Sequence, residues 1–94
     1  LYNINQLFMN INKLITIVKN KLENNIIIQD LKIEDKSFLH KNHKSHQVGK
    51  FHLKITIKSE ELDELSKIAS TKKIYTILEI ELKKYIHSIQ ILFN

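Results

Sequence analysis

The sequence predicts an α+β fold, a two-layer sandwich in which helices cover one face of a three-stranded mixed sheet. Three observations predict it. Apolar residues near the N-terminus recur at three- and four-residue intervals, which is the spacing of one helical face. Residues 50–58 alternate between apolar and polar side chains, as in a strand with one wet face. The length of 94 residues allows one hydrophobic core. The expected order is helix, strand, strand, helix, helix, strand.

The first helix is expected over residues 3–23, with Asn3 as a candidate N-cap. Met9 is the only methionine, so residues 1–8 are a candidate N-terminal extension that continues the helix. Residues 9–94 are expected to form a single domain. The apolar stripe that predicts this helix consists of Ile4, Leu7, Phe8, Ile11, Leu14, Ile15, Val18 and Leu22.

The middle of the chain predicts two strands joined by a long loop. Residues 26–34 are rich in β-branched residues and then alternate, which favours a strand. Residues 35–49 are polar, basic and rich in histidine, and they contain the only glycine. A loop of that length in a compact domain is usually functional or disordered. Residues 50–58 form the second expected strand, with His52 among the lysines of its wet face.

The C-terminal half predicts two helices and a last strand. Ser59 is expected to cap a short helix, because the glutamates after it favour the positive end of a helix. Ser70 or Thr71 is the expected N-cap of a second helix, and residues 86–93 form the expected last strand. The apolar residues of the two helices are Leu62, Leu65 and Ile68, then Ile74, Ile77, Leu78, Leu82 and Tyr85.

The composition excludes several kinds of site. The chain has no cysteine, so it offers no disulfide or thiolate, and a cytoplasmic location is expected. No apolar run approaches the ~20 residues of a membrane span, and no membrane association is expected. The formal net charge is +5, but scattered lysines favour a solvated surface. Without a glycine-rich phosphate loop or a nucleophile motif, we do not expect an enzyme.

Histidine is the most informative residue type in this chain. Imidazole is its only soft ligand that titrates near neutral pH, so metal or proton chemistry must use histidines or carboxylates. Four of the five histidines fall close together, and His87 stands alone near the C-terminal end. The four are His40, His43, His46 and His52.

Several segments resemble the BolA-like family, and the resemblance covers about residues 10–92. The family fold is a variant of the type II KH arrangement with the same order of elements. The spacing from Ser59 to Tyr75 and from Tyr75 to His87 fits the family pattern without a gap. The segments are Ile33-Glu34-Asp35-Lys36-Ser37 leading to His40, Phe51-His52-Leu53-Lys54-Ile55, Ile74-Tyr75-Thr76-Ile77-Leu78, and His87-Ser88-Ile89.

This resemblance implies a role for two histidines in binding a 2Fe-2S cluster. His87 matches the family's ligand to a cluster shared with a monothiol glutaredoxin. His40 matches the position of a second ligand in the loop, and His43 and then His46 are the alternatives. The resemblance implies that the partner's cysteine and a glutathione thiol complete the set, so the isolated protein is expected to hold no cluster. Without its partner we expect a monomer or a weak dimer.

The chain departs from the family pattern at two places. Ser70-Thr71-Lys72 replaces an Arg-His-Arg triplet, which puts any anion or partner contact made by that triplet in doubt. Phe51 replaces the serine that precedes the strand histidine.

The residues also allow plainer interpretations. On a regular strand His87 would share a face with Ile89 and Ile91 as a partly buried, hydrogen-bonded histidine. His52 is expected to be a solvated residue of the sheet. The loop histidines are either solvated or an adventitious site for nickel, copper or zinc.

A second function from a different class is a transcriptional regulator that binds duplex DNA. The two consecutive helices resemble a helix-turn-helix pair, with Lys67, Lys72 and Lys73 around the turn. The absence of arginine weakens sequence-specific readout, and Ala69 to Lys73 contains no glycine for an RNA-clamping KH loop.

Overall fold

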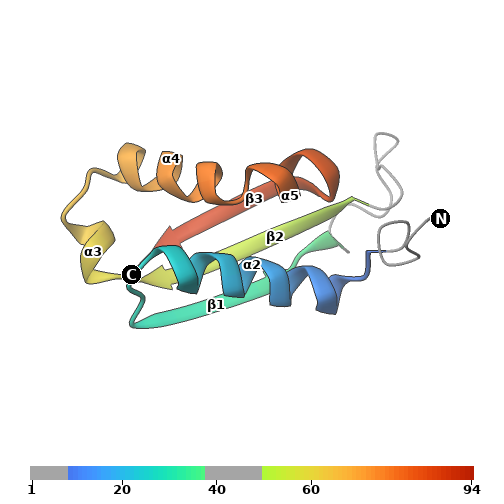
Figure 1. The fold of residues 1–94 in the computed structure, drawn as a ribbon, viewed down its shortest axis with the longest axis horizontal. Coiled ribbons are helices and arrows are strands. Elements are labelled where there is room, and N and C mark those ends of the chain that lie inside the picture. The colour runs from blue at the N-terminus through green and yellow to red at the C-terminus, as the bar shows by residue number, and fades with distance from the viewer. Residues whose placement is uncertain (1–8, 38–49) are drawn as a thin grey trace.

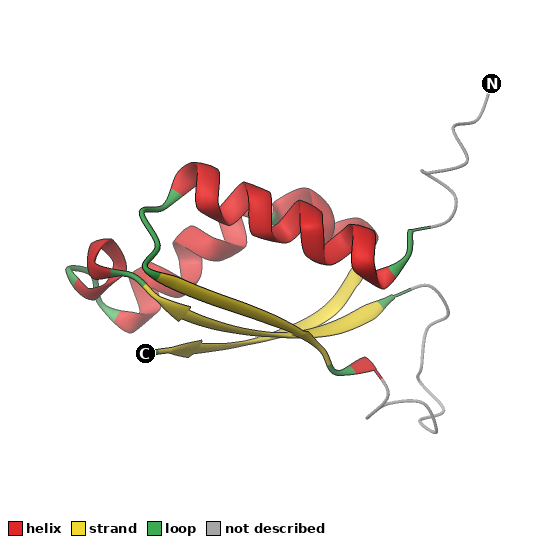
Figure 2. Ribbon diagram, turned by 90° about the horizontal axis from the view of Figure 1, so that it is seen from below, coloured by secondary structure: helices red, strands yellow, loops and turns green. Residues whose placement is uncertain are grey.

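The computed structural model describes residues 9–37 and 50–94, which form one three-stranded sheet with helices on one face (Figures 1 and 2). The strands are β1 (Asp30–Asp35), β2 (Phe51–Lys58) and β3 (Ile86–Phe93). The helices are α2 (Ile11–Asn25), α3 (Glu60–Asp63), α4 (Lys67–Ile77) and α5 (Glu79–Lys84). The α+β sandwich and its order of elements are therefore confirmed.

Helix α2 begins where Asn10 caps it. Asn10 has an extended backbone, and its side-chain oxygen accepts a hydrogen bond from the Lys13 amide at 2.8 Å. A continuous helix over residues 3–23 is therefore wrong at its N-terminal end. The candidate extension at residues 1–8 and its cap Asn3 lie outside the described residues.

The sheet is mixed, as the sequence predicts, and its strands lie in the order β1-β2-β3. Strand β1 pairs antiparallel with β2, and β2 pairs parallel with β3. Their buried faces meet α2, α4 and α5 over one continuous core (Figure 2). This core contains Leu14, Val18, Leu22, Ile26, Leu53, Ile55, Ile57, Leu62, Ile74, Leu78 and Ile86.

Serine caps place the helices between β2 and β3. The Ser59 oxygen accepts from the Leu62 amide at 3.1 Å, which confirms it as the cap of α3. Ser66, and not Ser70 or Thr71, caps α4, since its oxygen accepts from the Ala69 amide at 3.1 Å. Ser70 is instead buried inside α4, where its hydroxyl donates to the Leu62 carbonyl.

Helix α4 also ends earlier than expected, because the sequence suggests one long helix where the structure has two. Leu78 interrupts the helix with a non-helical backbone, and α5 follows as a separate short helix up to Lys84. Leu78 is fully buried, so this break keeps the chain packed against the sheet before β3 begins. Within the described parts of the chain, no helix is long and apolar enough to span a membrane.

Candidate functional site

Two histidines meet at the end of the sheet where β2 and β3 both begin. Because these strands are parallel, their N-terminal ends lie at the same edge. The His52 and His87 ring centroids are 4.9 Å apart, with 60° between the ring planes. The edge therefore carries a histidine pair built from residues that are far apart in the sequence.

A β-bulge at His87 breaks the regular pairing of β3 with β2. Phe51 pairs with Ile86, but His52 pairs with Ser88, so His87 is the extra residue on β3. Bulges redirect side chains, and they are common beside functional sites. Ile86 stays buried while His87 and Ser88 are both exposed. The interpretation of His87 as a partly buried residue on the face of Ile89 and Ile91 is therefore wrong, and the bulge is the reason.

His52 is buried, with only 6% of its surface exposed, so the expectation of a solvated sheet residue is also wrong. Its Nδ1 atom lies 2.7 Å from Ser88 Oγ, within hydrogen-bond distance. On the other side, the segment after β1 packs along it. The His52 amide donates to Ser37 Oγ at 3.0 Å, and the Lys36 amide donates to the His52 carbonyl at 2.7 Å.

The two ends of the histidine-rich loop lie at this same edge. Asp35 accepts a hydrogen bond from the Ser37 amide at 2.9 Å, and Ser37 in turn binds His52. At the other end, the Phe51 amide donates to the Tyr85 carbonyl at 2.9 Å, just before His87. The described chain therefore enters and leaves the loop beside the histidine pair.

The three loop candidates, His40, His43 and His46, lie outside the described residues. Within residues 9–37 and 50–94, no group of three or more histidine, aspartate or glutamate side chains is placed to hold a metal ion. The described site thus offers one exposed imidazole, His87, backed by a buried one.

The surface beside the pair is basic. A hollow of about 340 Å³ is lined by His52, Ser88, Gln90, Lys36 and Lys54, together with the carbon atoms of two core residues. Glu34 Oε1 lies 3.7 Å from Lys36 Nζ and 3.6 Å from Lys32 Nζ, so one carboxylate faces two ammonium groups. This environment favours an anionic ligand or partner surface near His87.

The lysines of the DNA-binding hypothesis do not form one cluster. Lys73 Nζ lies 2.8 Å from Glu61 Oε2, and Glu61 Oε1 accepts from the Ile27 amide at 3.2 Å. The hydrogen bond from Lys73, and then that from Ile27, lower the pKa of Glu61 below its ordinary value of 4.5. Lys67 and Lys72 instead line a separate hollow on the outer side of α4.

Sequence reasoning missed Ser37 and Ser88, the two hydroxyls that hold His52. Ser88 directly follows His87, but its contact with His52 can be expected only when the parallel pairing and the bulge are known. The covering of His52 by residues 36 and 37 has no signal in the strand pattern, because alternation does not reveal what packs on the polar face.

Comparisons with known proteins agree with this fold. A family model described as BolA-like protein matches residues 22–93. The BolA domain of SufE1 from Arabidopsis thaliana has 26% identity and a TM-score of 0.72, covering 84% of this chain and 87% of that one. BolA1 from Arabidopsis thaliana has 22% identity and a TM-score of 0.70, with the same two coverages.

A further similar structure is the solution structure of BolA1 from Mus musculus. It has 18% identity and a TM-score of 0.66, and the alignment covers 82% of this chain and 60% of that one. A search of curated proteins gives no match.

Proposed function

This chain belongs to the BolA-like protein family, and from that premise we propose that it is an adaptor that shares a 2Fe-2S cluster with a monothiol glutaredoxin. The role would lie in iron-sulfur trafficking or iron regulation. One observation carries the proposal: His87 is exposed on a β-bulge, beside the segment that enters the histidine-rich loop. Its imidazole is therefore accessible to a partner.

The ligand chemistry supports a shared site and not a self-contained one. Iron-sulfur clusters take four ligands, mostly thiolates, and two histidines can replace two cysteines on one iron. The chain has no cysteine, so its own contribution is limited to imidazoles. A glutaredoxin cysteine and a glutathione thiol would supply the sulfur ligands, and two histidines of this chain would bind the second iron.

The second ligand in this proposal is His40, with His43 and His46 as alternatives in that order. His40 follows Ser37 by three residues, and three residues span at most about 11 Å. Ser37 is hydrogen-bonded to His52, whose ring contacts His87. Chain length therefore allows His40 to reach the same metal ion as His87.

The other residues of the site would hold His87 in place. His52 is buried and hydrogen-bonded to Ser88, so it presents a fixed ring surface against which the His87 ring rests. Groups that fix a ligand's orientation are a regular part of metal sites. The nearby lysines would attract an anionic group of the partner complex, such as the carboxylates of glutathione.

The proposal is tested by reconstitution with a monothiol glutaredoxin, glutathione, iron and sulfide. We expect the visible absorption and circular dichroism spectra of the glutaredoxin-bound cluster to change when the wild-type protein is added. His87→Ala should strongly reduce this change, and Leu92→Ala, an exposed residue of the same strand that does not line the hollow beside His52, should retain it. An unchanged spectrum with the wild type, or the same change with His87→Ala, would contradict the proposal.

The same reconstitution experiment identifies the loop ligand. His40→Ala should weaken the spectral change more than His43→Ala or His46→Ala does. If all three single variants give the full wild-type spectral change, this would contradict a loop ligand. His87 would then be the one ligand from this chain.

We do not extend the proposal to duplex DNA. Lys73 forms an ion pair with Glu61. Lys67 and Lys72 border a hollow that is lined mainly by apolar atoms. Phosphate contacts need a run of available cationic or hydrogen-bonding groups, which these three residues do not form.

A further inference from the structure

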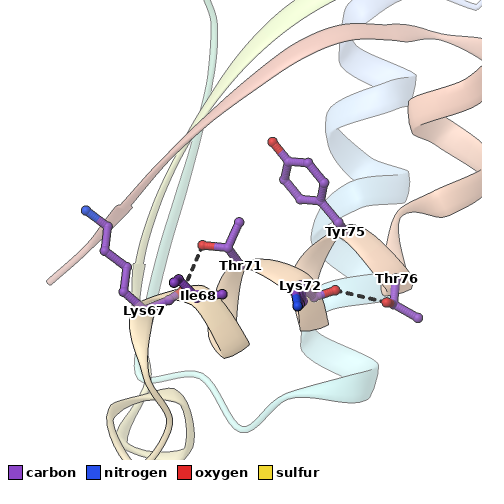
Figure 3. A pocket seen from close by; sticks show the side chains of 6 residues that line it. All are labelled: Lys67, Ile68, Thr71, Lys72, Tyr75 and Thr76. Atoms are coloured by element: carbon purple, nitrogen blue, oxygen red, sulfur yellow. Dashed lines mark hydrogen bonds between the residues drawn. The ribbon is translucent and has the colours of Figure 1, made fainter.

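The outer side of α4 carries a groove that the cluster site does not use. Its hollow of about 660 Å³ is lined by six residues of this one helix (Figure 3). Ile68 is 71% exposed and Tyr75 is 43% exposed, although the inner side of α4 buries Ile74 in the core. The lining residues are Lys67, Ile68, Thr71, Lys72, Tyr75 and Thr76.

The groove has the shape that helix packing uses. Its lining residues form two rows with a spacing of four, 67-71-75 and 68-72-76, and Figure 3 shows Lys67, Thr71 and Tyr75 along one side of the helix. Side chains spaced by four residues form ridges, and the groove between two such ridges accepts the ridge of another helix. Eleven residues of α4 give a contact length of about 16 Å, or three turns.

The interior of the groove is mainly apolar, and its two threonine hydroxyls are already bonded within the helix. Thr71 Oγ1 donates to the Lys67 carbonyl at 2.8 Å, and Thr76 Oγ1 donates to the Lys72 carbonyl at 2.9 Å. These bonds satisfy both hydroxyls within the helix. The groove therefore offers carbon atoms of isoleucine, threonine and tyrosine to an apolar side chain.

The borders of the groove are positively charged. In the described parts of the chain, Lys67 and Lys72 form no ion pair. Lys67 is the first residue of α4, where the helix dipole disfavours a cation, and the first turn has no acidic residue. The positive end of the helix and the two lysines together complement a negatively charged partner.

We propose that this groove binds an acidic amphipathic helix of a partner protein. An apolar ridge of that helix would lie between Ile68 and Tyr75, and its carboxylates would face Lys67 and Lys72. Helix-in-groove recognition of this kind is common among protein partners. Duplex DNA fits less well, because it would leave Ile68 exposed and because the chain has no arginine. The inference does not depend on cluster sharing.

The probe for this site is a synthetic helical peptide of about four turns, with leucines spaced by three and four residues and flanking glutamates. Its binding to the full-length protein is measured by fluorescence anisotropy. Ile68→Ser should weaken binding by about tenfold. The matched control is Ile27→Ser, which is 70% exposed in the connection after α2 and should bind as the wild type does.

The charge complementarity has its own pair of variants. Lys72→Glu should weaken binding of the acidic peptide by about tenfold. Lys19→Glu, at an exposed position of α2, should leave it unchanged. A peptide with lysines in place of the glutamates should bind the wild type more weakly than the acidic one.

The inference would be overturned by no binding of the acidic peptide, equal binding of the basic one, equal losses with Ile27→Ser, or a duplex DNA that competes with the peptide for the groove. Self-association that disappears with Ile68→Ser would also overturn it, since the occupant would then be a second copy of this chain. Sedimentation of the wild type and Ile68→Ser distinguishes that case.

Discussion

Replacing His52 tests whether its ring is buried and packed, as the structure shows, or lies on a solvated face of the sheet. His52→Ala removes a ring that is 6% exposed and its contact with Ser88 at 2.7 Å. The hydrogen bond contributes about 1 kcal/mol net, and the space left by the ring costs about 1–2 kcal/mol more. We therefore expect the free energy of unfolding to fall by about 2–3 kcal/mol.

Two further variants separate the ring from its hydrogen bond. His52→Phe keeps an aromatic ring in the same space but leaves Ser88 without that partner, so it should cost only about 1 kcal/mol. Ser88→Ala should cost about 0.5–1 kcal/mol, because the serine itself is exposed and water replaces part of the bond. In the double variant with His52→Phe, the two losses should not add, because both remove the same contact.

Urea unfolding of these variants gives the required values, provided that the dependence on denaturant stays constant. Gln90→Ala, an exposed residue of the same strand, serves as the control and should change stability by less than about 0.5 kcal/mol. If His52→Ala is as stable as this control, the burial of the His52 ring and the site built on it are wrong.

The remaining predictions concern the framework around the site. Ser66→Ala removes the cap of α4 and should cost about 1 kcal/mol in urea unfolding. Because the pKa of Glu61 is lowered on folding, its ion pair stabilises the protein above pH 4.5 and is lost as pH falls below it, so Glu61→Gln should flatten the acid dependence of stability. Lys21→Met leaves the 5% exposed Glu81 carboxylate unpaired and should cost about 1–2 kcal/mol, whereas Lys83→Met, from an exposed pair, should cost under about 0.5 kcal/mol by thermal unfolding.

The elements with strong local signals are those that the sequence predicted well. The second strand, expected over residues 50–58 and found at Phe51–Lys58, and the Ser59 cap agree with the structure, because alternation and a serine before acidic residues act within a few positions. The sequence favours Ser70 or Thr71 as the cap of α4, whereas Ser66 is the cap. Several hydroxyl residues in one short segment are equally good caps, and only the packing of Ser70 in the core decides between them.

The site was less predictable because it depends on pairing between distant segments. The exposure of His87 follows from a bulge that appears only when β3 is aligned with β2. The burial of His52 follows from the segment at Ser37, fifteen residues away, folding back onto it. Neither the bulge nor the covering of His52 produces a periodic pattern in the sequence. The resemblance to the BolA-like family drew attention to His87, and the structure adds the residues that support it.

The most direct test of cluster sharing is pulsed electron paramagnetic resonance on the reduced complex with a monothiol glutaredoxin and glutathione. The chain would be labelled with ¹⁵N only at histidine, so any strong ¹⁵N coupling to the iron spin identifies a ligand from this protein. We expect coupling from two histidines in the wild type and from one in His87→Ala. A wild-type spectrum without ¹⁵N coupling, or a His87→Ala spectrum that still shows both, would contradict the proposed function.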